Sequence, residues 1–554
     1  MSRLRRTAAR RAACWIGGLS AAVLLISCDR AAPLQNAAPA GSRPPGGAQG
    51  EPLAAAEIER APSGKRRVFT SPLAGDWYSA GRRELAGEID GYLAAAPDRK
   101  IEKLCGLVLP HAGYRWSGAT AAHGVRQLQD RAIDRVVVIG PSHRVPMESI
   151  ASVPGFTHYA TPLGEVALDR KFIAELREHA EFQEIPFVHE SEHSVGIQLP
   201  LLQRVLNDFQ LVPIVVGDLD RATVRKLGRI LGGLVDQRTL VVASSDFTHY
   251  GANFGYLPFS DEVPENLKKL DGGAIDRLCE KNLDGFLDYI DQTGATICGR
   301  CAIGVLLAML PADAQVRQLH YETSGRITGD WSSSVSYCAF AVIGGWPPGQ
   351  PATAEEQSAD LSPAERADLL RLARATLTCL LEKKELPAAE PAEIRVTPAM
   401  RRPSGAFVTL HKSGQLRGCI GEVVPTRPLY RCVMAQAVNA GLNDHRFPPV
   451  ELPEMDAIQI EISTLTPLRP VASVSEIEIG RHGVVLKKGE RGALFLPQVA
   501  TEQGWDLETT LAHLSRKAGL PEDAWQQGAA FEVFEAIVFG EEEPRAGAAE
   551  AGSR

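Results

Sequence analysis

The first half of the chain alternates short apolar runs with stretches of helical spacing. Four near-continuous apolar runs predict buried strands, at residues 104–110, 135–139, 211–216 and 239–243. Between them, stretches such as 169–178 and 221–235 repeat apolar residues every three or four positions, which predicts helices. Because buried parallel strands are apolar on both faces and are joined by helices, this alternation indicates an α/β domain with a largely parallel, covered sheet.

The last third of the chain has a mixed pattern. Residues 364–385 predict one long helix, because their apolar side chains recur at helical spacing. This stripe comprises Leu369, Leu370, Ala373, Leu377, Leu380 and Leu381. Short strands are expected at 405–410, 457–465 and 493–496.

Composition shifts divide the chain into segments. A polar, proline-containing stretch separates the two patterned regions, and an Ala/Pro/Gly-rich stretch without periodicity precedes the first. The predicted segments are a leader at 1–28, a tether at 29–65, a first domain at 66–346, a linker at 347–360, a second domain at 361–542 and a disordered tail at 543–554.

The composition excludes three classes of protein. Of the 554 residues 44% are hydrophobic, which is ample for buried cores and excludes a disordered chain. After the first thirty residues the sequence has no apolar run of about 18 residues, which excludes a polytopic membrane protein. The 59 basic and 67 acidic residues give a net charge of −8, whereas a nucleic-acid-binding protein normally has a basic excess. A small-molecule or peptide substrate, or a partner protein, is the expected ligand.

The N-terminus is typical of a targeting segment. Five arginines and no acid precede an uncharged, mostly apolar stretch from Ala12 to Ser27. The sequence LISC, which ends at Cys28, resembles the lipobox of bacterial lipoproteins. That resemblance implies that Cys28 is diacylated and anchors the chain in the cell envelope, on the periplasmic side of the inner or outer membrane. The alternatives are a short transmembrane anchor and an ordinary signal peptide.

Polar side chains follow three of the predicted strands. They are His111 after the first strand, His143 after the second, and Asp246 and His249 after the fourth. Because strand carboxyl ends form the ligand crevice of an open α/β sheet, we expect these side chains to converge on one rim. Glu192 with His193, and Cys298 with Cys301, are two further clusters whose placement the pattern leaves open, and Glu192, His193 and Cys301 are possible pocket residues.

Seven ordered motifs over residues 66–345 resemble the Memo family. They are PHAGY, GPSHRVP, TPLGEV, EHSVGIQLP, SSDFTHY, ICGRCAIG and TSGRITGDWSSSVSY. The resemblance implies an α/β fold similar to that of the class III extradiol ring-cleaving dioxygenases, enzymes that hold non-haem iron.

The same resemblance implies a metal site. Matched motif by motif, its ligands are His111, His143 and Cys298, while Asp246 and His249 line the pocket. Two imidazoles and a thiolate leave open positions, as a catalytic site requires, and the soft thiolate favours iron(II), copper or zinc. Because a thiolate replaces the carboxylate of the usual facial triad, ring cleavage itself is in question. His249 is the acid–base candidate, and Asp246 would either orient it or support the metal ligands from behind.

Cys301 departs from the family pattern. It forms a CxxC motif with Cys298, and such a pair can be a redox pair or half of a zinc site. A Cys298–Cys301 disulfide formed in an oxidising periplasm would abolish the metal site. A further alternative is a domain that binds metal weakly or serves only as a binding module, because the family includes an adaptor for phosphorylated peptides in animals.

The second domain contains the motif LRGCIG at residues 416–421 and resembles the AMMECR family, which implies an α+β fold. Its prominent polar motif residues are Arg417, Cys419, Asp444 and Arg446. The flanking glycines would let the backbone of Cys419 approach a ligand, and Arg417 would stabilise its thiolate. A nucleophile would also need a base, for which His445 and His513 are candidates. The alternative is a tight strand–turn whose cysteine packs inward.

The two domains together resemble the AmmeMemoRadiSam system proteins B and A, which implies a radical-SAM enzyme as a partner. The chain has no CxxxCxxC motif of its own, and export would separate it from that cytosolic partner. The first interpretation is a membrane-anchored, metal-dependent redox enzyme. The second is a non-catalytic lipoprotein that binds a metal or a peptide, and the third is hydrolase- or transferase-like chemistry at Cys419.

Overall fold

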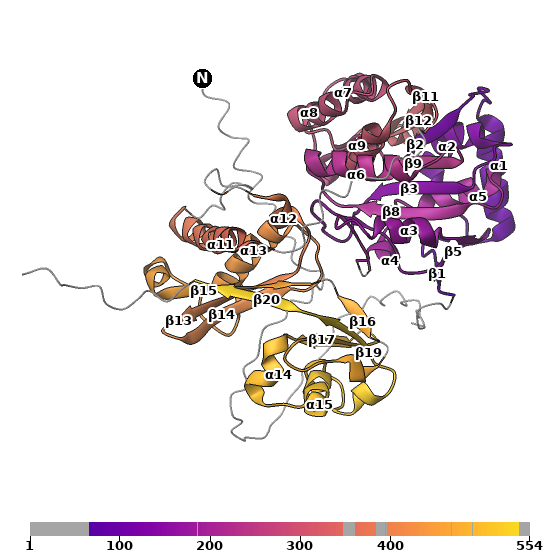
Figure 1. The fold of residues 1–554 in the computed structure, drawn as a ribbon. Coiled ribbons are helices and arrows are strands. Elements are labelled where there is room, and N and C mark those ends of the chain that lie inside the picture. The colour runs from indigo at the N-terminus through magenta and orange to yellow at the C-terminus, as the bar shows by residue number, and fades with distance from the viewer. Residues whose placement is uncertain are drawn as a thin grey trace, which may run out of the picture. The chain divides into compact units, whose positions relative to one another are not determined.

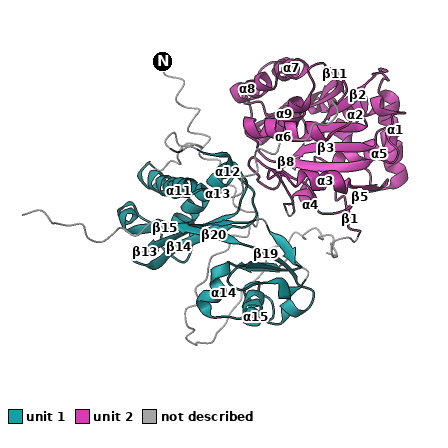
Figure 2. Ribbon diagram, viewed as in Figure 1, with its two compact units in different colours: residues 1–54, 357–554 teal, residues 55–356 magenta. Residues whose placement is uncertain are grey.

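The chain forms two compact units (Figure 2). Unit 2 comprises residues 55–356, and unit 1 comprises residues 357–554 together with 1–54. The structure is a computed structural model. It describes residues 66–185, 187–346, 361–383, 394, 396–466, 468–471, 473–489 and 491–541. The predicted leader with Cys28, the tether, the linker and the tail lie outside these residues. Within the described part, no helix is both long and apolar enough to span a bilayer.

Four parallel strands form the centre of unit 2. In sheet order they are β2 (Leu104–Leu109), β9 (Thr239–Ser244), β3 (Arg135–Pro141) and β8 (Gln210–Val216). Every residue of β2 and β9 is buried, as expected for strands that are covered on both faces. The four strands predicted from the apolar runs are therefore confirmed.

The flanks of this sheet are mostly antiparallel, which the apolar runs did not predict. On one side β12 (Ser333–Ile343) runs antiparallel to β2, and β10 (His249–Gly251) and β11 (Gln315–Thr323) pair with it. On the other side β4 (Ala151–Ser152) runs antiparallel to β8, and β7 (Phe182–Gln183) pairs with β4. An apolar run reports burial and leaves strand direction open, so only the centre of the sheet matches the prediction. Three short strands form a separate sheet: β1 (Val68–Thr70), β5 (His158–Thr161) and β6 (Gly164–Ala167).

Helices connect and cover these strands (Figure 1). They are α1 (Arg82–Ala95), α2 (Tyr114–Val125), α3 (Arg170–Leu176), α4 (Val188–Ser191), α5 (Leu199–Val205), α6 (Arg221–Leu234), α7 (Val263–Cys279), α8 (Leu283–Thr293), α9 (Arg300–Met309) and α10 (Ser324–Thr328). The two predicted helices correspond to α3 and α6. Each begins at an aspartate whose carboxylate accepts a backbone N–H of the first turn, Asp169 in α3 and Asp220 in α6.

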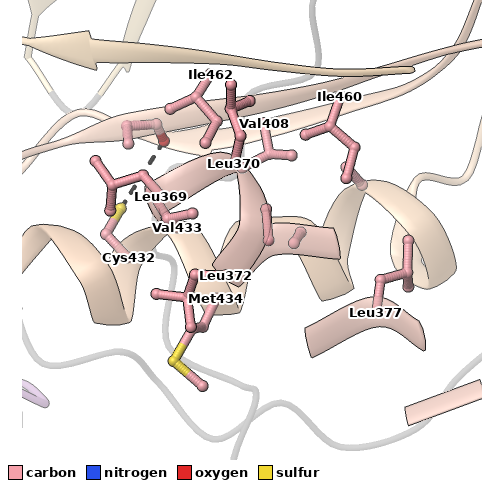
Figure 3. Packing of buried hydrophobic residues seen from close by; sticks show 14 of the residues in the cluster. Leu369, Leu370, Leu372, Leu377, Val408, Cys432, Val433, Met434, Ile460 and Ile462 are labelled. Carbon is pink, nitrogen blue, oxygen red and sulfur yellow. Dashed lines mark hydrogen bonds between the residues drawn. The ribbon is translucent and has the colours of Figure 1, made fainter. Parts of the chain in front are cut away.

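In unit 1 an antiparallel sheet packs against two helices. Its strands, in sheet order, are β14 (Gln415–Glu422), β13 (Ala406–Lys412), β15 (Ile458–Leu465) and β20 (Ala536–Gly540). The helices are α11 (Pro363–Lys383), which corresponds to the predicted long helix, and α13 (Leu429–Val438). Figure 3 shows Leu369 of α11 and Val433 of α13 packing with Val408 and Ile462 of the sheet.

A second antiparallel sheet completes unit 1. It comprises β16 (Arg469–Val471), β19 (Ala530–Phe534), β17 (Gly483–Lys488) and β18 (Arg491–Phe495). The short helices α12 (Pro398–Arg401), α14 (Pro497–Gln503) and α15 (Leu507–Lys517) belong to the same unit. Phe407 and Cys419 of the first sheet share an apolar cluster with Val485 and Phe534 of the second. The two sheets therefore share a core.

Candidate metal site

Three side chains from separate parts of unit 2 meet beside the carboxyl ends of its central strands. His111 follows β2, His143 follows β3, and Cys298 precedes α9. The Nε2 atom of His111 lies 3.1 Å from Sγ of Cys298, and each of the three residues offers a ligand atom within 4.8 Å of the others. His111 is buried, Cys298 is half-buried and His143 is exposed, so the group opens to solvent at His143. The structure thus brings together the three residues that the resemblance implied as ligands.

A buried hydrogen-bond network supports His111. Its Nδ1 atom lies 3.0 Å from the hydroxyl of Ser244, the last residue of β9. That hydroxyl donates to the carbonyl of Ser194 at 2.6 Å and accepts the side-chain amide of Gln198 at 2.9 Å. Ser194, Gln198 and Ser244 are all fully buried, so this network is shielded from water.

The carboxylate of Glu192 supports His143. Oε1 of Glu192 lies 2.9 Å from Nδ1 of His143, and Oε2 accepts the backbone N–H of His143 at 2.5 Å. Oε1 also accepts the backbone N–H groups of His193 and Ser194, both at 2.9 Å. Burial raises the pKa of Glu192, but its hydrogen bonds with His143 outweigh this effect and lower the pKa to about 2. Glu192 is therefore an anion throughout the physiological range.

His193 is a third imidazole at this site. Its Nδ1 lies 3.2 Å from Oε1 of Glu192, and its ring stacks on His143 on one hand and on Trp77 on the other. Burial, followed by the effect of His111, lowers the pKa of His193 to about 3. His143, Glu192 and His193 also form a group whose ligand atoms lie within 4.8 Å of one another.

Asp246 contacts two of the three predicted ligands, and His249 contacts the segment that leads to Cys298. The Oδ1 atom of Asp246 accepts the backbone N–H of His111 at 2.8 Å, and its backbone carbonyl lies 3.6 Å from Sγ of Cys298. Burial raises the pKa of Asp246. Nδ1 of His249 lies 3.0 Å from the carbonyl of Thr296. Asp246 thus holds the His111 backbone, which corresponds to the second of the two roles considered for it, support of a metal ligand.

Burial dominates the protonation of the two buried members of the group. It lowers the pKa of His111 well below its ordinary value, with a further contribution from His143, so the ring is neutral. It raises the pKa of the Cys298 thiol well above its ordinary value, and the charge of Asp246 adds to this shift.

Cys301 does not join the group. It is buried on α9, where Sγ accepts the backbone N–H of Leu219 at 3.4 Å. Cys298 and Cys301 are both free thiols, so the disulfide considered for the CxxC motif is not formed in this structure. Cys301 lies about one helical turn after Cys298, so its side chain packs between α9 and the segment that precedes α6.

In unit 1, Cys419 lies on β14 with its side chain in the apolar cluster that joins the two sheets. Its backbone N–H donates to Asp444 at 2.9 Å, and its carbonyl accepts the guanidinium of Arg446 at 3.1 Å. Asp444 and Arg446 form an ion pair of 2.7 Å, in which only 1% of the aspartate side chain is exposed. The hydroxyl of Thr409 on β13 donates to Sγ of Cys419 at 3.3 Å.

The proposed stabilisation of a Cys419 thiolate by Arg417 does not match this geometry. The guanidinium of Arg417 instead binds Glu454 at 2.9 Å and the carbonyl of Pro448 at 2.8 Å. The two candidate bases are also placed elsewhere, since His445 is exposed and His513 stacks on Trp505. The arrangement favours the alternative in which Cys419 packs inward.

Comparison with known proteins identifies the family of the domain that carries this site. Residues 70–341 match the family described as Memo-like protein. Protein memo-1 homolog of Caenorhabditis elegans is 34% identical over 285 residues, which cover 49% of this chain and 81% of the relative. The chain belongs to the Memo family. Protein MEMO1 of Homo sapiens is 30% identical to the Memo region over 284 residues, which cover 49% of this chain and 95% of the relative.

An AMMECR1 domain follows the Memo domain. Residues 370–539 match the family described as AMMECR1. The crystal structure of an uncharacterized protein from Pyrococcus horikoshii is 37% identical and covers 32% of this chain and 91% of that protein, with a TM-score of 0.30.

Three residues of the Memo site were not assigned a role from the sequence. Ser244 lies in the SSDFTHY motif, two residues before Asp246, and its place at the end of a buried strand was the available signal. Gln198 lies in the EHSVGIQLP motif, but its partners Pro110 and Ser244 are distant in sequence, and Trp77 lies in none of the motifs.

Proposed function

We propose that this chain is a metal-dependent oxidoreductase of the cell envelope that resembles the extradiol dioxygenases in the fold of its Memo domain and uses iron(II) or copper, with zinc as a further candidate. The observation that supports this proposal is the group formed by His111, His143 and Cys298, in which an imidazole nitrogen and a thiol lie 3.1 Å apart. Its donor atoms fit a transition metal, because two imidazoles and a thiolate suit iron, copper and zinc.

The residues present would hold a metal through Nε2 of His111, the ring of His143 and Sγ of Cys298. A metal bound there would retain open positions, and iron or copper, unlike zinc, would supply one-electron chemistry with dioxygen. Because His143 is exposed, solvent reaches the group on that side.

His249 is the residue that would move a proton. The Thr296 carbonyl can only accept a hydrogen bond, so Nδ1 of a neutral His249 donates at 3.0 Å and Nε2 keeps its lone pair. A neutral imidazole with a free lone pair can take a proton from a substrate and return it later. Its ring also contacts Phe254, which is 40% exposed, so an apolar side chain lies at the solvent edge beside it.

The test is metal analysis of the full chain, purified under reducing conditions without added metal. We expect about one iron or copper per chain, lost in His111→Ala and Cys298→Ser, and dioxygen consumption that falls with the metal. Matched controls are His158→Ala and Cys279→Ser, which replace half-buried side chains of the same unit outside the group. Wild-type protein that contains no metal would refute the metalloenzyme proposal.

The second candidate is a non-catalytic lipoprotein module that captures a metal or a peptide. The side chain of His143, which is 29% exposed, favours it, because a ligand that solvent can reach can receive a metal from another molecule. Metal bound in the expected ratio without dioxygen turnover would support this candidate.

Anchoring and partnership extend the proposal. Acylation at Cys28 would hold the chain on the periplasmic face of a membrane, and Cys28→Ser should then move it to the soluble fraction. By family resemblance, a radical-SAM enzyme is the proposed partner, and co-purification from the native host would test it.

A further inference from the structure

We propose that Ser244 and Glu192 are positioning residues that hold His111 and His143 as the tautomers with hydrogen on Nδ1, so that both Nε2 atoms are presented to a metal. The proposal rests on the proposed function in one respect, since it takes these two histidines as ligands. It assigns roles to the residues behind the site and predicts that the site is preformed without metal.

The hydrogen bonds around Ser244 determine the tautomer of His111. The hydroxyl has one hydrogen, and the carbonyl of Ser194 at 2.6 Å can only accept it. The amide of Gln198 donates to the same oxygen, and its orientation is fixed because the same nitrogen donates to the carbonyl of Pro110 at 2.9 Å. Ser244 therefore has no hydrogen left for His111, and Nδ1 of His111 must be the donor at 3.0 Å.

The opposite nitrogen of His111 then carries the lone pair. Nε2 lies 3.1 Å from Sγ of Cys298, close enough to accept the thiol hydrogen while no metal is bound. A metal between the two residues would use the same lone pair, so binding requires loss of the thiol proton and leaves the imidazole tautomer unchanged.

Glu192 determines the tautomer of His143 by the same reasoning. A carboxylate only accepts hydrogen bonds, so Nδ1 of His143 donates to it at 2.9 Å and Nε2 is the nitrogen left for a metal. Both oxygens of Glu192 also accept backbone N–H groups, from His143, His193 and Ser194. Moving Glu192 onto a metal would break these bonds, so we assign the group of His143, Glu192 and His193 a supporting role and not a second metal site.

One short segment joins the two supports. The carbonyl of Ser194 accepts the hydroxyl of Ser244, and the N–H of Ser194 donates to Glu192. The hydroxyl of Ser194 donates to the carbonyl of Pro141 at 2.9 Å, which ties the segment to the end of β3. Residues 192–194 therefore orient His111 through Ser244 and His143 through Glu192.

The first experiment measures the tautomers directly. Long-range ¹⁵N–¹H correlation spectra of the metal-free full chain, with His111→Ala and His143→Ala used for assignment, should show hydrogen on Nδ1 of both rings. In Ser244→Ala the His111 signal should shift toward the other tautomer while the His143 signal stays unchanged. In Glu192→Gln the His143 signal should shift while the His111 signal stays unchanged. Hydrogen on Nε2 of either ring in the wild type would overturn the proposal.

The second experiment measures Cu⁺ affinity by competition with a chromogenic chelator under anaerobic conditions. Both variants should bind about 10- to 100-fold more weakly, as is typical when the support of a ligand is removed. Controls are Ser336→Ala and Glu181→Gln, a buried serine of β12 and a buried glutamate paired with Lys226, which should bind as the wild type does. Unchanged affinity in Ser244→Ala, or two ions per wild-type chain, would overturn the proposal.

The two experiments separate this proposal from the function it rests on. If Glu192→Gln fails to fold, the Ser244→Ala arm alone decides. A wild type that consumes no dioxygen would defeat the oxidoreductase proposal, whereas the spectra of the metal-free protein would still decide the tautomers.

Discussion

Two cysteines, Cys298 in the Memo domain and Cys419 in the AMMECR domain, stand next to a glycine in a short polar motif but have different surroundings. Sγ of Cys298 faces Nε2 of His111, whereas Cys419 packs in an apolar cluster with a threonine hydroxyl as its neighbour. A half-buried thiol beside an imidazole is equipped for metal binding, and a thiol in a core is equipped for packing.

The glycines of the two motifs have the same explanation. A Cβ on Gly299 would lie 2.5 Å from the carbonyl oxygen of Ser244, and one on Gly418 would lie 2.1 Å from that of Ala440. Each glycine is required because another backbone passes close to it, and this contact explains the glycine without a role in ligand binding. A glycine beside a cysteine therefore indicates close packing, and the group opposite the thiol indicates the chemistry.

The largest expected effect comes from replacing each cysteine in turn. Cys298→Ser should reduce metal affinity by more than the about 100-fold that loss of a supporting residue causes, because it removes a soft ligand. Cys419→Ser should leave the metal content unchanged. Metal analysis of both variants beside the wild type measures this, and metal loss in Cys419→Ser would contradict the comparison.

A second prediction tests whether the AMMECR motif is structural. Asp444→Ala removes the carboxylate that pairs with Arg446 and accepts the N–H of Cys419, so the free energy of unfolding should fall by about 3–5 kcal/mol. Urea denaturation, with hydrogen exchange of β14 peptides as the readout, measures this change in the free energy of unfolding.

The matched control is Glu478→Ala, which breaks a pair with Arg481 whose side chains are 60% and 58% exposed and should therefore have little effect on the free energy of unfolding. Equal losses in the two variants would show that the Asp444–Arg446 pair has no special structural role.

The strand ends of the Memo domain show what the sequence allows. His111, His143 and Asp246 could be predicted to converge because each follows an apolar run, and parallel neighbours bring their carboxyl ends together. Cys298 precedes a helix, and only the family resemblance associated it with the histidines. The roles of Glu192 and Ser244 were not predictable, because they depend on which hydrogen-bond partners the fold places within 3 Å.

In the AMMECR domain, prediction of the elements succeeded and interpretation of the motif was less successful. The stripe of α11 marked the core because helical spacing reports one buried face. Spacing alone also suggested that Arg417 would reach Cys419, two residues away on the same strand. The structure pairs Arg417 with Glu454, a residue distant in sequence that no local pattern could have indicated.

A third prediction concerns acid stability of the Memo domain. Burial lowers the pKa of His189 to about 4, and the charge of Glu192 offsets this in part. Unfolded chains take up this proton near pH 6.5, so the free energy of unfolding should fall as the pH drops from about 6.5 to 4, by about 3 kcal/mol from this residue.

Denaturation is measured between about pH 6.5 and 4, with hydrogen exchange of β4 peptides as the readout. The free energy of unfolding should depend less steeply on pH in His189→Leu than in the wild type. A residual slope is expected from His111, His123 and His193, because burial lowers the pKa of each of these residues as well. A slope identical to that of the wild type would show that His189 does not couple to unfolding.

The smallest expected effect is that of Thr409→Val, which tests whether Cys419 is a nucleophile or only packs in the core. Thr409→Val preserves shape and removes the hydroxyl that donates to Sγ of Cys419 at 3.3 Å, so the free energy of unfolding should change by no more than about 1 kcal/mol. If the thiol only packs, its slow alkylation by iodoacetamide should also be unchanged, because burial and not the hydroxyl limits access. The half-buried Cys279 serves as the internal reference for reagent and exposure. If Cys419 is a nucleophile, its alkylation should instead slow several-fold when the Thr409 hydroxyl is removed. Cys298 and Cys419 would then both be functional thiols that differ only in how reactive they are.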